Sequence, residues 1–137
     1  MYEVAHEKAT SAQKNLPLRV LLTLLVTVVV ARALVFFTPN WFHTEIADTH
    51  IHHLTWGILL LALCGYLNVV YRGKKWRPWL ALLYGVGLGL TFDEFAMWIK
   101  LTTNYWSWLS YSAVLVIAIL LLIATAVRAF QQRHWKQ

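Results

Sequence analysis

Four long apolar stretches dominate this chain and leave few folds open to it. A helix needs about 20 apolar residues to cross the hydrocarbon core of a bilayer. The stretches approach or exceed that length, and they cover residues 17–38, 50–71, 79–100 and 109–127. The connections between them are short, so consecutive helices should run antiparallel. The sequence therefore predicts an all-α membrane protein, an up-down four-helix transmembrane bundle that forms a single domain over residues 1–137.

The composition agrees with a membrane protein. Of the 137 residues, 59% are apolar and 13% are charged, whereas a soluble domain carries roughly 25% charged residues. The net charge of +6 comes from basic residues at the ends of the apolar stretches, where they set topology and contact anionic headgroups. We therefore expect membrane lipid, and no nucleic acid, as a partner. The one cysteine, Cys64, lies within an apolar stretch, which is typical of a small buried or lipid-facing residue.

The distribution of lysine and arginine predicts the orientation. Basic residues precede the first stretch, lie between the second and third, and follow the fourth, while the first connection has none and the third has only Lys100. Cytoplasmic segments carry the excess of lysine and arginine. We expect a multi-pass protein of the plasma (inner) membrane with both termini in the cytoplasm and with residues 1–15 as a short cytoplasmic segment. A cleaved signal peptide ending at "ARA" is disfavoured because the apolar sequence continues as "LVFF".

Polar residues interrupt the apolar stretches at one predicted depth. The segment "DTHIHH" opens the second stretch, Asp93 and Glu94 lie near the outer end of the third, and Arg32 lies near the outer end of the first. At 1.5 Å per residue, the two acids and Arg32 are each roughly 10 Å below that end. Charged groups that face lipid are costly. We therefore expect these side chains to face one another inside the bundle.

Imidazoles and carboxylates without a thiolate form a ligand set for zinc, iron or manganese. His50 and His53 stand at positions i and i+3 of a helix that begins near residue 50, so they share one face. A divalent cation would also compensate carboxylates buried in the membrane. We expect His50 and His53 with Asp93 or Glu94 as metal ligands, and zinc as the ion, with iron and manganese as alternatives.

Further donors stand close by in the sequence. Asp48 and His52 are at positions i and i+4, on an adjacent face if the helix begins that early, and His43 and Glu45 lie in the preceding loop. These donors bring the total above four, so a two-metal site is open as well. Haem is disfavoured because all the outer histidines belong to one stretch, and a second axial ligand would need a dimer.

Explanations without a metal stay open. Arg32 can pair with Asp93 or Glu94 in an ion pair that only fixes helix packing, while the histidines bond to water and headgroups. Tyr111 and Ser112 lie at the same predicted depth and can supply a hydroxyl donor or bond to the backbone.

A small-residue pattern predicts how the third stretch packs. Ala81, Gly85, Gly89 and Asp93 recur every four residues, which makes a face that another helix can approach closely. Glu94 lies about 100° away on a helix, so the two acids can flank a cavity or bridge between partners.

The segments "HIHHLTWGILLLAL", "ALLYGVGLGLTFDEFAMW" and "YW…SYSAV" resemble a group of small four-span bacterial and archaeal integral membrane proteins. In that group a histidine cluster opens the second span and a "GLGL..DE" segment closes the third. The resemblance covers roughly residues 20–125 and implies the fold but no activity. The group has an aspartate where this chain has Ser112, which weakens a role for that position. A looser likeness, in chemistry alone, is to alkaline-ceramidase and adiponectin-receptor membrane hydrolases, which hold zinc with three histidines.

These features favour a metal-dependent integral membrane enzyme that hydrolyses an ester or amide of a lipid-like substrate at the outer leaflet. Glu94 or Asp93 would act as the general base, and Arg32 would stabilise an oxyanion or hold a headgroup phosphate. With iron, the protein would instead be a di-iron oxidoreductase. A non-catalytic metal-binding protein for sensing, assembly or transport and a structural membrane subunit are the alternatives, and a homo-oligomer is open in each case.

Overall fold

The computed structural model describes residues 15–38, 44–46, 49–71, 73, 75–100 and 108–134, with the backbone alone at 44–46, 49–51, 98, 100 and 132–134. The expected cytoplasmic segment 1–15 lies outside the described residues except for Asn15. The helices are α2 (Leu16–Phe37), α3 (His53–Val70), α4 (Arg77–Asp93), α5 (Phe95–Lys100) and α6 (Trp108–His134). Two short strands, β1 (Thr44–Ile46) and β2 (Thr49–Ile51), precede α3.

In the described part of the chain, α2, α3 and α6 are long and apolar enough to cross a membrane. Their large apolar side chains are mostly exposed in the isolated chain, as expected of helices whose outer surfaces face lipid. The protein is therefore a helical membrane protein. The predicted third span, 79–100, is divided at Glu94 into α4, which has 17 residues, and the short α5.

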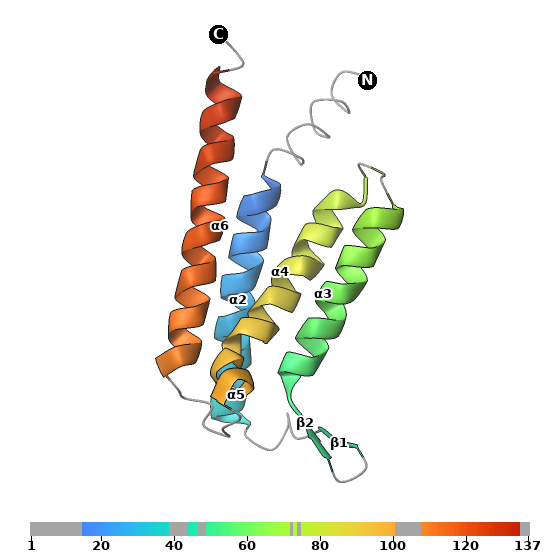
Figure 1. Ribbon diagram of the computed structural model, residues 1–137, viewed down its shortest axis with the longest axis vertical. Coiled ribbons are helices and arrows are strands. Elements are labelled where there is room, and N and C mark those ends of the chain that lie inside the picture. Colours follow the sequence, from blue (N-terminus) through green and yellow to red (C-terminus); the bar gives the residue numbers. More distant parts are fainter. Residues whose placement is uncertain are drawn as a thin grey trace.

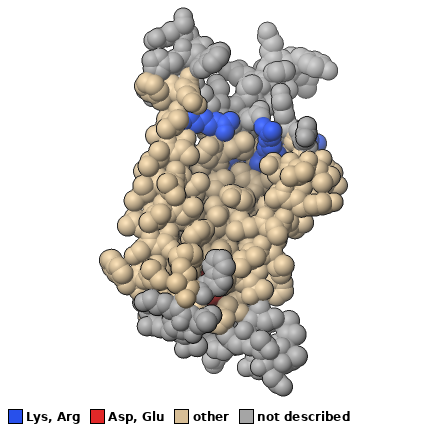
Figure 2. Space-filling model, viewed as in Figure 1, with Lys and Arg blue, Asp and Glu red and all other residues tan. Residues whose placement is uncertain are grey.

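The long helices pack side by side, and each runs antiparallel to the next (Figure 1). Helix α4 contacts both α2 and α3, and α6 packs against α2 and α4. The end where α2 and α4 begin and α6 finishes carries Arg19, Arg77 and Arg128, and we call it the basic end. The opposite end holds Asp93 and Glu94 and is called the acidic end. Figure 2 shows the same separation on one face, with the visible lysine and arginine atoms toward one end and acidic atoms toward the other.

Close contact between α4 and α2 depends on two glycines. A Cβ on Gly85 would lie 2.7 Å from the carbonyl oxygen of Val20, and one on Gly89 would lie 2.7 Å from the Cβ of Thr27. Any larger residue would push the helices apart, as in small-residue interfaces of membrane helices generally. This face includes the predicted small-residue pattern. It places Asp93, four residues after Gly89, against α2.

Helix α3 packs on a second face of α4. A Cβ on Gly57 of α3 would lie 2.6 Å from Oγ1 of Thr91 and 2.8 Å from its backbone nitrogen. On α4, a Cβ on Gly87 would lie 3.0 Å from the side chain of Leu61. The two faces of α4 therefore bring α2 and α3 close to its acidic end from different directions.

The start of α3 differs from the expectation. Strands β1 and β2 pair antiparallel with Glu45 opposite His50, so His50 belongs to β2, and α3 begins at His53 rather than near residue 50. His52 is extended, with φ −72° and ψ 148°. The expected helical spacing between His50 and His53 therefore does not apply. The spacing between Asp48 and His52 fails for the same reason, and Asp48 itself lies outside the described residues.

Candidate acid–base site at the acidic end

Five ionisable side chains from three parts of the fold meet at the acidic end. They are Arg32 of α2, His52 and His53 at the start of α3, Asp93 at the end of α4, and Glu94 between α4 and α5. We call them the acid–base cluster. Asp93 is 0% exposed, Glu94 3% and His53 7%. Burial of this degree makes any unpaired charge costly, so the pairing within the cluster decides its chemistry.

Asp93 is held mainly by Arg32. The Nε of Arg32 donates to Oδ1 of Asp93 at 2.6 Å, and its Nη2 donates to the backbone oxygen of Asp93 at 3.3 Å. The guanidinium carbon also lies 3.9 Å from the ring centroid of Tyr111 on α6, a cation–π contact. The short first contact has the length of a charge-assisted hydrogen bond. Arg32 therefore joins α2, α4 and α6 at one point.

His53 lies between the two acids. Its Nε2 is 3.3 Å from Oδ2 of Asp93, and its Nδ1 is 3.3 Å from Oε1 of Glu94. A neutral imidazole has one donor and one acceptor nitrogen, and an ionised carboxylate only accepts. Both contacts are favourable when His53 is doubly protonated or when one acid carries a proton. The three side chains can therefore share a proton or direct their lone pairs at a cation.

The carboxylate of Glu94 also caps the N-terminus of α3. Its Oε2 accepts a hydrogen bond of 2.9 Å from the backbone N–H of Leu54, and its Oε1 is 3.4 Å from Nδ1 of His52. The N-cap residue, His52, provides no side-chain cap for its own helix. The first N–H groups of a helix lack partners within the helix, and its dipole favours a negative charge there. Glu94 supplies both needs from the junction between α4 and α5.

The hydroxyls near the cluster serve packing. Ala96 of α5 donates its backbone N–H to Oγ of Ser110 at 3.2 Å, and both residues are buried. Ser112 donates to the carbonyl of Trp108 in its own helix at 3.1 Å, which agrees with the backbone alternative considered from the sequence. Tyr111 contributes its ring face to Arg32.

The structure thus brings Arg32, His52, His53, Asp93 and Glu94 together. The backbones of His50 and Glu45 pair in the hairpin, but their side chains are not described, and His43 and Asp48 lie outside the described residues. Among the side chains that the structure does describe, no group of three or more histidines, cysteines or acids is arranged to hold a metal ion.

Sequence reasoning missed three contributors to the site. They are the ring of Tyr111 under Arg32, the N–H of Leu54 on Glu94, and Ser110. No signal for the second existed in the sequence alone, because the lack of a serine, threonine, aspartate or asparagine at the N-cap is apparent only once α3 is known to begin at His53. Such a start needs an acceptor from elsewhere.

Comparisons with protein-family models, curated proteins and solved structures find no match to this chain. The fold and the site therefore define its class: a helical membrane protein with a buried acid–base cluster at one end.

Proposed function

We propose that this protein is a metal-dependent integral membrane enzyme, with its ion at the acid–base cluster. The observation that carries the proposal is the pair of distances to Oε1 of Glu94, 3.3 Å from Nδ1 of His53 and 3.4 Å from Nδ1 of His52. Charge-assisted hydrogen bonds are shorter, at about 2.7–2.9 Å. Two ligands bound tetrahedrally at about 2.0–2.1 Å from a zinc ion are about 3.3–3.4 Å apart. Each of these two distances, taken as a pair, equals the separation of two ligands on one zinc ion, although the three side chains are not arranged as a complete metal-binding group.

The remaining contacts of the cluster match the hydrogen bonds that usually orient metal ligands. A histidine that binds a metal through one nitrogen usually donates its other N–H to a carboxylate. If His53 binds through Nδ1, its Nε2 faces Asp93 at 3.3 Å, and Arg32 in turn fixes Asp93 at 2.6 Å. His50 and Asp48 are candidates for a further ligand, on the sequence alone.

The proposed reaction is hydrolysis of an ester or amide in a lipid-like substrate. A bound zinc ion would make a water molecule more acidic and polarise the substrate carbonyl, and iron or manganese could occupy the same donors. Glu94 serves as a ligand in this scheme, so Asp93 is the candidate general base. Arg32, whose side chain is 12% exposed, is the candidate to stabilise an oxyanion or to hold a headgroup phosphate.

The same proposal places the chain in the membrane. Helix α4 with α5 forms the fourth crossing, beside α2, α3 and α6. The basic end lies in the cytoplasm with both termini, because lysine and arginine accumulate on that side of the plasma (inner) membrane. The acid–base cluster then lies toward the outer leaflet, where a lipid substrate enters.

Metal analysis tests the proposal directly. Protein purified in detergent without chelators should contain about one zinc, iron or manganese ion per chain, measured by inductively coupled plasma mass spectrometry. His53→Ala and Glu94→Ala should each lose that ion. Cys64→Ala is the matched control, because this thiol is buried elsewhere in α3 and should leave the metal content unchanged. Metal-free wild-type protein after incubation with each ion, or full metal content in His53→Ala, would refute the ligand assignment.

A second function has its own supporting observation. Asp93 already bonds to Arg32, and Glu94 already bonds to the N–H of Leu54, so the cluster can act as an ion-pair network in a non-catalytic membrane subunit. Stoichiometric metal without hydrolysis of any lipid ester or amide would favour a metal-binding role in sensing, assembly or transport. Absence of metal together with unchanged folding would favour the structural subunit.

A further inference from the structure

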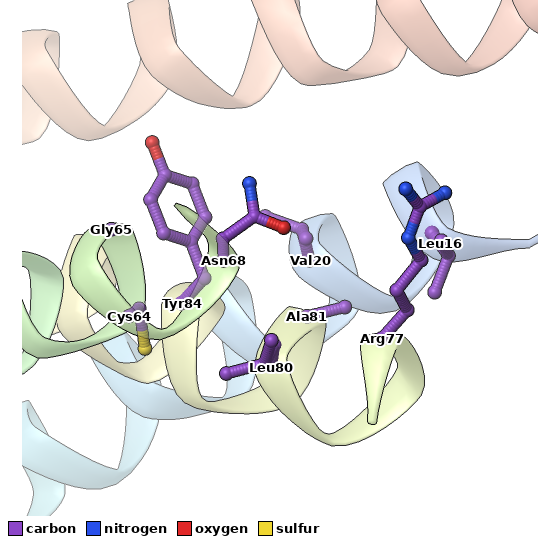
Figure 3. A pocket seen from close by; sticks show the side chains of 9 residues that line it. All are labelled: Leu16, Val20, Cys64, Gly65, Asn68, Arg77, Leu80, Ala81 and Tyr84. Atoms are coloured by element: carbon purple, nitrogen blue, oxygen red, sulfur yellow. The ribbon is translucent and has the colours of Figure 1, made fainter. Parts of the chain in front are cut away.

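A groove at the basic end lies far from the acid–base cluster along the helices. It has a volume of about 370 Å³ and lies between α2, α3 and α4 (Figure 3). Its lining residues are Leu16, Val20, Cys64, Gly65, Asn68, Arg77, Leu80, Ala81 and Tyr84. On α4 these residues recur at helical spacing, so one face of the helix forms one side of the groove.

The groove combines apolar walls with a polar group at several points. Figure 3 shows the guanidinium of Arg77, the amide of Asn68 and the phenol of Tyr84 extending to the same side, above the apolar side chains of the lining. Arginine pairs with phosphate through parallel hydrogen bonds, and an amide or phenol adds further donors. No described carboxylate forms an ion pair with Arg77, and the described acids Asp93 and Glu94 lie at the opposite end of the bundle.

Gly65 provides a second, independent observation. The other helical glycines are explained by close helix contacts, because a Cβ at each would meet an atom at 3.0 Å or less; they are Gly57, Gly85, Gly87 and Gly89. A Cβ on Gly65 would meet nothing within 4 Å. Glycine within a helix costs about 1 kcal/mol relative to alanine, and at Gly65 no helix contact offsets this cost. The missing side chain instead widens the groove.

We propose that this groove binds one anionic phospholipid. The phosphate lies on Arg77 and Asn68, and one acyl chain runs along the apolar wall past Gly65. Charge complementarity selects the anionic headgroup, since a basic pocket between membrane helices attracts such lipids. The apolar wall selects an amphiphile over a free phosphate ion, which would leave that surface in contact with water.

The proposal is tested on the full chain in detergent by native mass spectrometry. Phosphatidylglycerol and phosphatidylcholine with identical acyl chains are titrated separately. We expect one phosphatidylglycerol retained per chain, with at least a tenfold preference over phosphatidylcholine, because the choline cation of phosphatidylcholine is repelled by Arg77 while the phosphates of the two lipids are alike. Arg77→Gln should abolish that preference. Arg128→Gln is the matched control, because Arg128 is a basic residue of α6 at the same end that does not line the groove.

The acyl chain is tested separately with Gly65→Leu. The added side chain enters open space, so this variant should keep its helical content by circular dichroism. It should bind both lipids at least tenfold more weakly. Glycerol phosphate at millimolar concentration should not displace the lipid. Equal binding of the two lipids, equal losses from Arg77→Gln and Arg128→Gln, no effect of Gly65→Leu, or displacement by glycerol phosphate would each overturn the proposal.

Discussion

The ion pair between Arg32 and Asp93 gives the sharpest test of how the cluster is held. Arg32→Leu removes the cation at 2.6 Å from a carboxylate that is 0% exposed. Removing one partner of a buried ion pair costs about 3–5 kcal/mol, because the other charge stays buried without compensation. The Nε2 of His53, at 3.3 Å from the second oxygen, remains as a hydrogen-bonding partner of the carboxylate in this variant. We therefore expect a loss near the lower limit, about 3 kcal/mol.

A second substitution should recover much of that loss. In the double variant Arg32→Leu/Asp93→Asn, neither charge is present, and the amide still offers an oxygen or an N–H to His53. Replacing a whole buried ion pair by uncharged groups is often close to neutral. We expect the double variant to be more stable than Arg32→Leu by about 1–2 kcal/mol, because it no longer buries a carboxylate without its cation.

The free energy of unfolding is measured in mixed micelles by titration with SDS, with circular dichroism as the readout. Arg128→Leu on α6 is the control and should change stability by less than about 0.5 kcal/mol, because this half-buried arginine lies at the basic end, away from the acid–base cluster. If Arg32→Leu costs less than about 1 kcal/mol, or if the double variant is no more stable than Arg32→Leu, the pair does not compensate the buried charge and this reasoning fails.

Three further predictions concern packing, capping and the metal. Gly89→Leu should lower the unfolding midpoint strongly, because its Cβ would lie 2.7 Å from Thr27, whereas Gly65→Leu should not; equal effects would contradict the packing argument. Glu94→Ala should cost about 1 kcal/mol as a lost helix cap, while Glu94→Gln keeps an acceptor for Leu54 and should cost less in the same SDS titration. On the proposed function, adding zinc at 100 times its dissociation constant to chelator-treated protein should stabilise it by about 2.7 kcal/mol, and His53→Ala should remove this increase.

Part of this architecture follows from local sequence patterns. Apolar stretches of membrane length predicted the helices, and the four-residue repeat of Gly85, Gly89 and Asp93 predicted a closely packed face. Helical rise alone also placed Arg32 near the depth of Asp93, and the two residues form an ion pair. These predictions succeed because each depends on spacing within a helix, and the depths of Arg32 and Asp93 are both counted from the same end of the bundle.

The differences arise where distant segments decide the local structure. Nothing in "HTEIADTHI" has the periodicity of a strand, yet pairing with β1 keeps His50 out of α3. No proline or glycine marks the end of α4 at Asp93. Glu94 instead bonds to the start of α3, and that contact exists only after α3 and α4 have packed.

The two packing faces of α4 explain why His53 is central to the site. Consecutive residues on a helix diverge by about 100°, so Asp93 and Glu94 leave the end of α4 in different directions. Asp93 follows the glycine face onto α2 and meets Arg32, while Glu94 turns to the start of α3 and meets the N–H of Leu54. His53 contacts both acids, one through each ring nitrogen. His53 is therefore placed to link the two acids, either by a shared proton or by a shared ion.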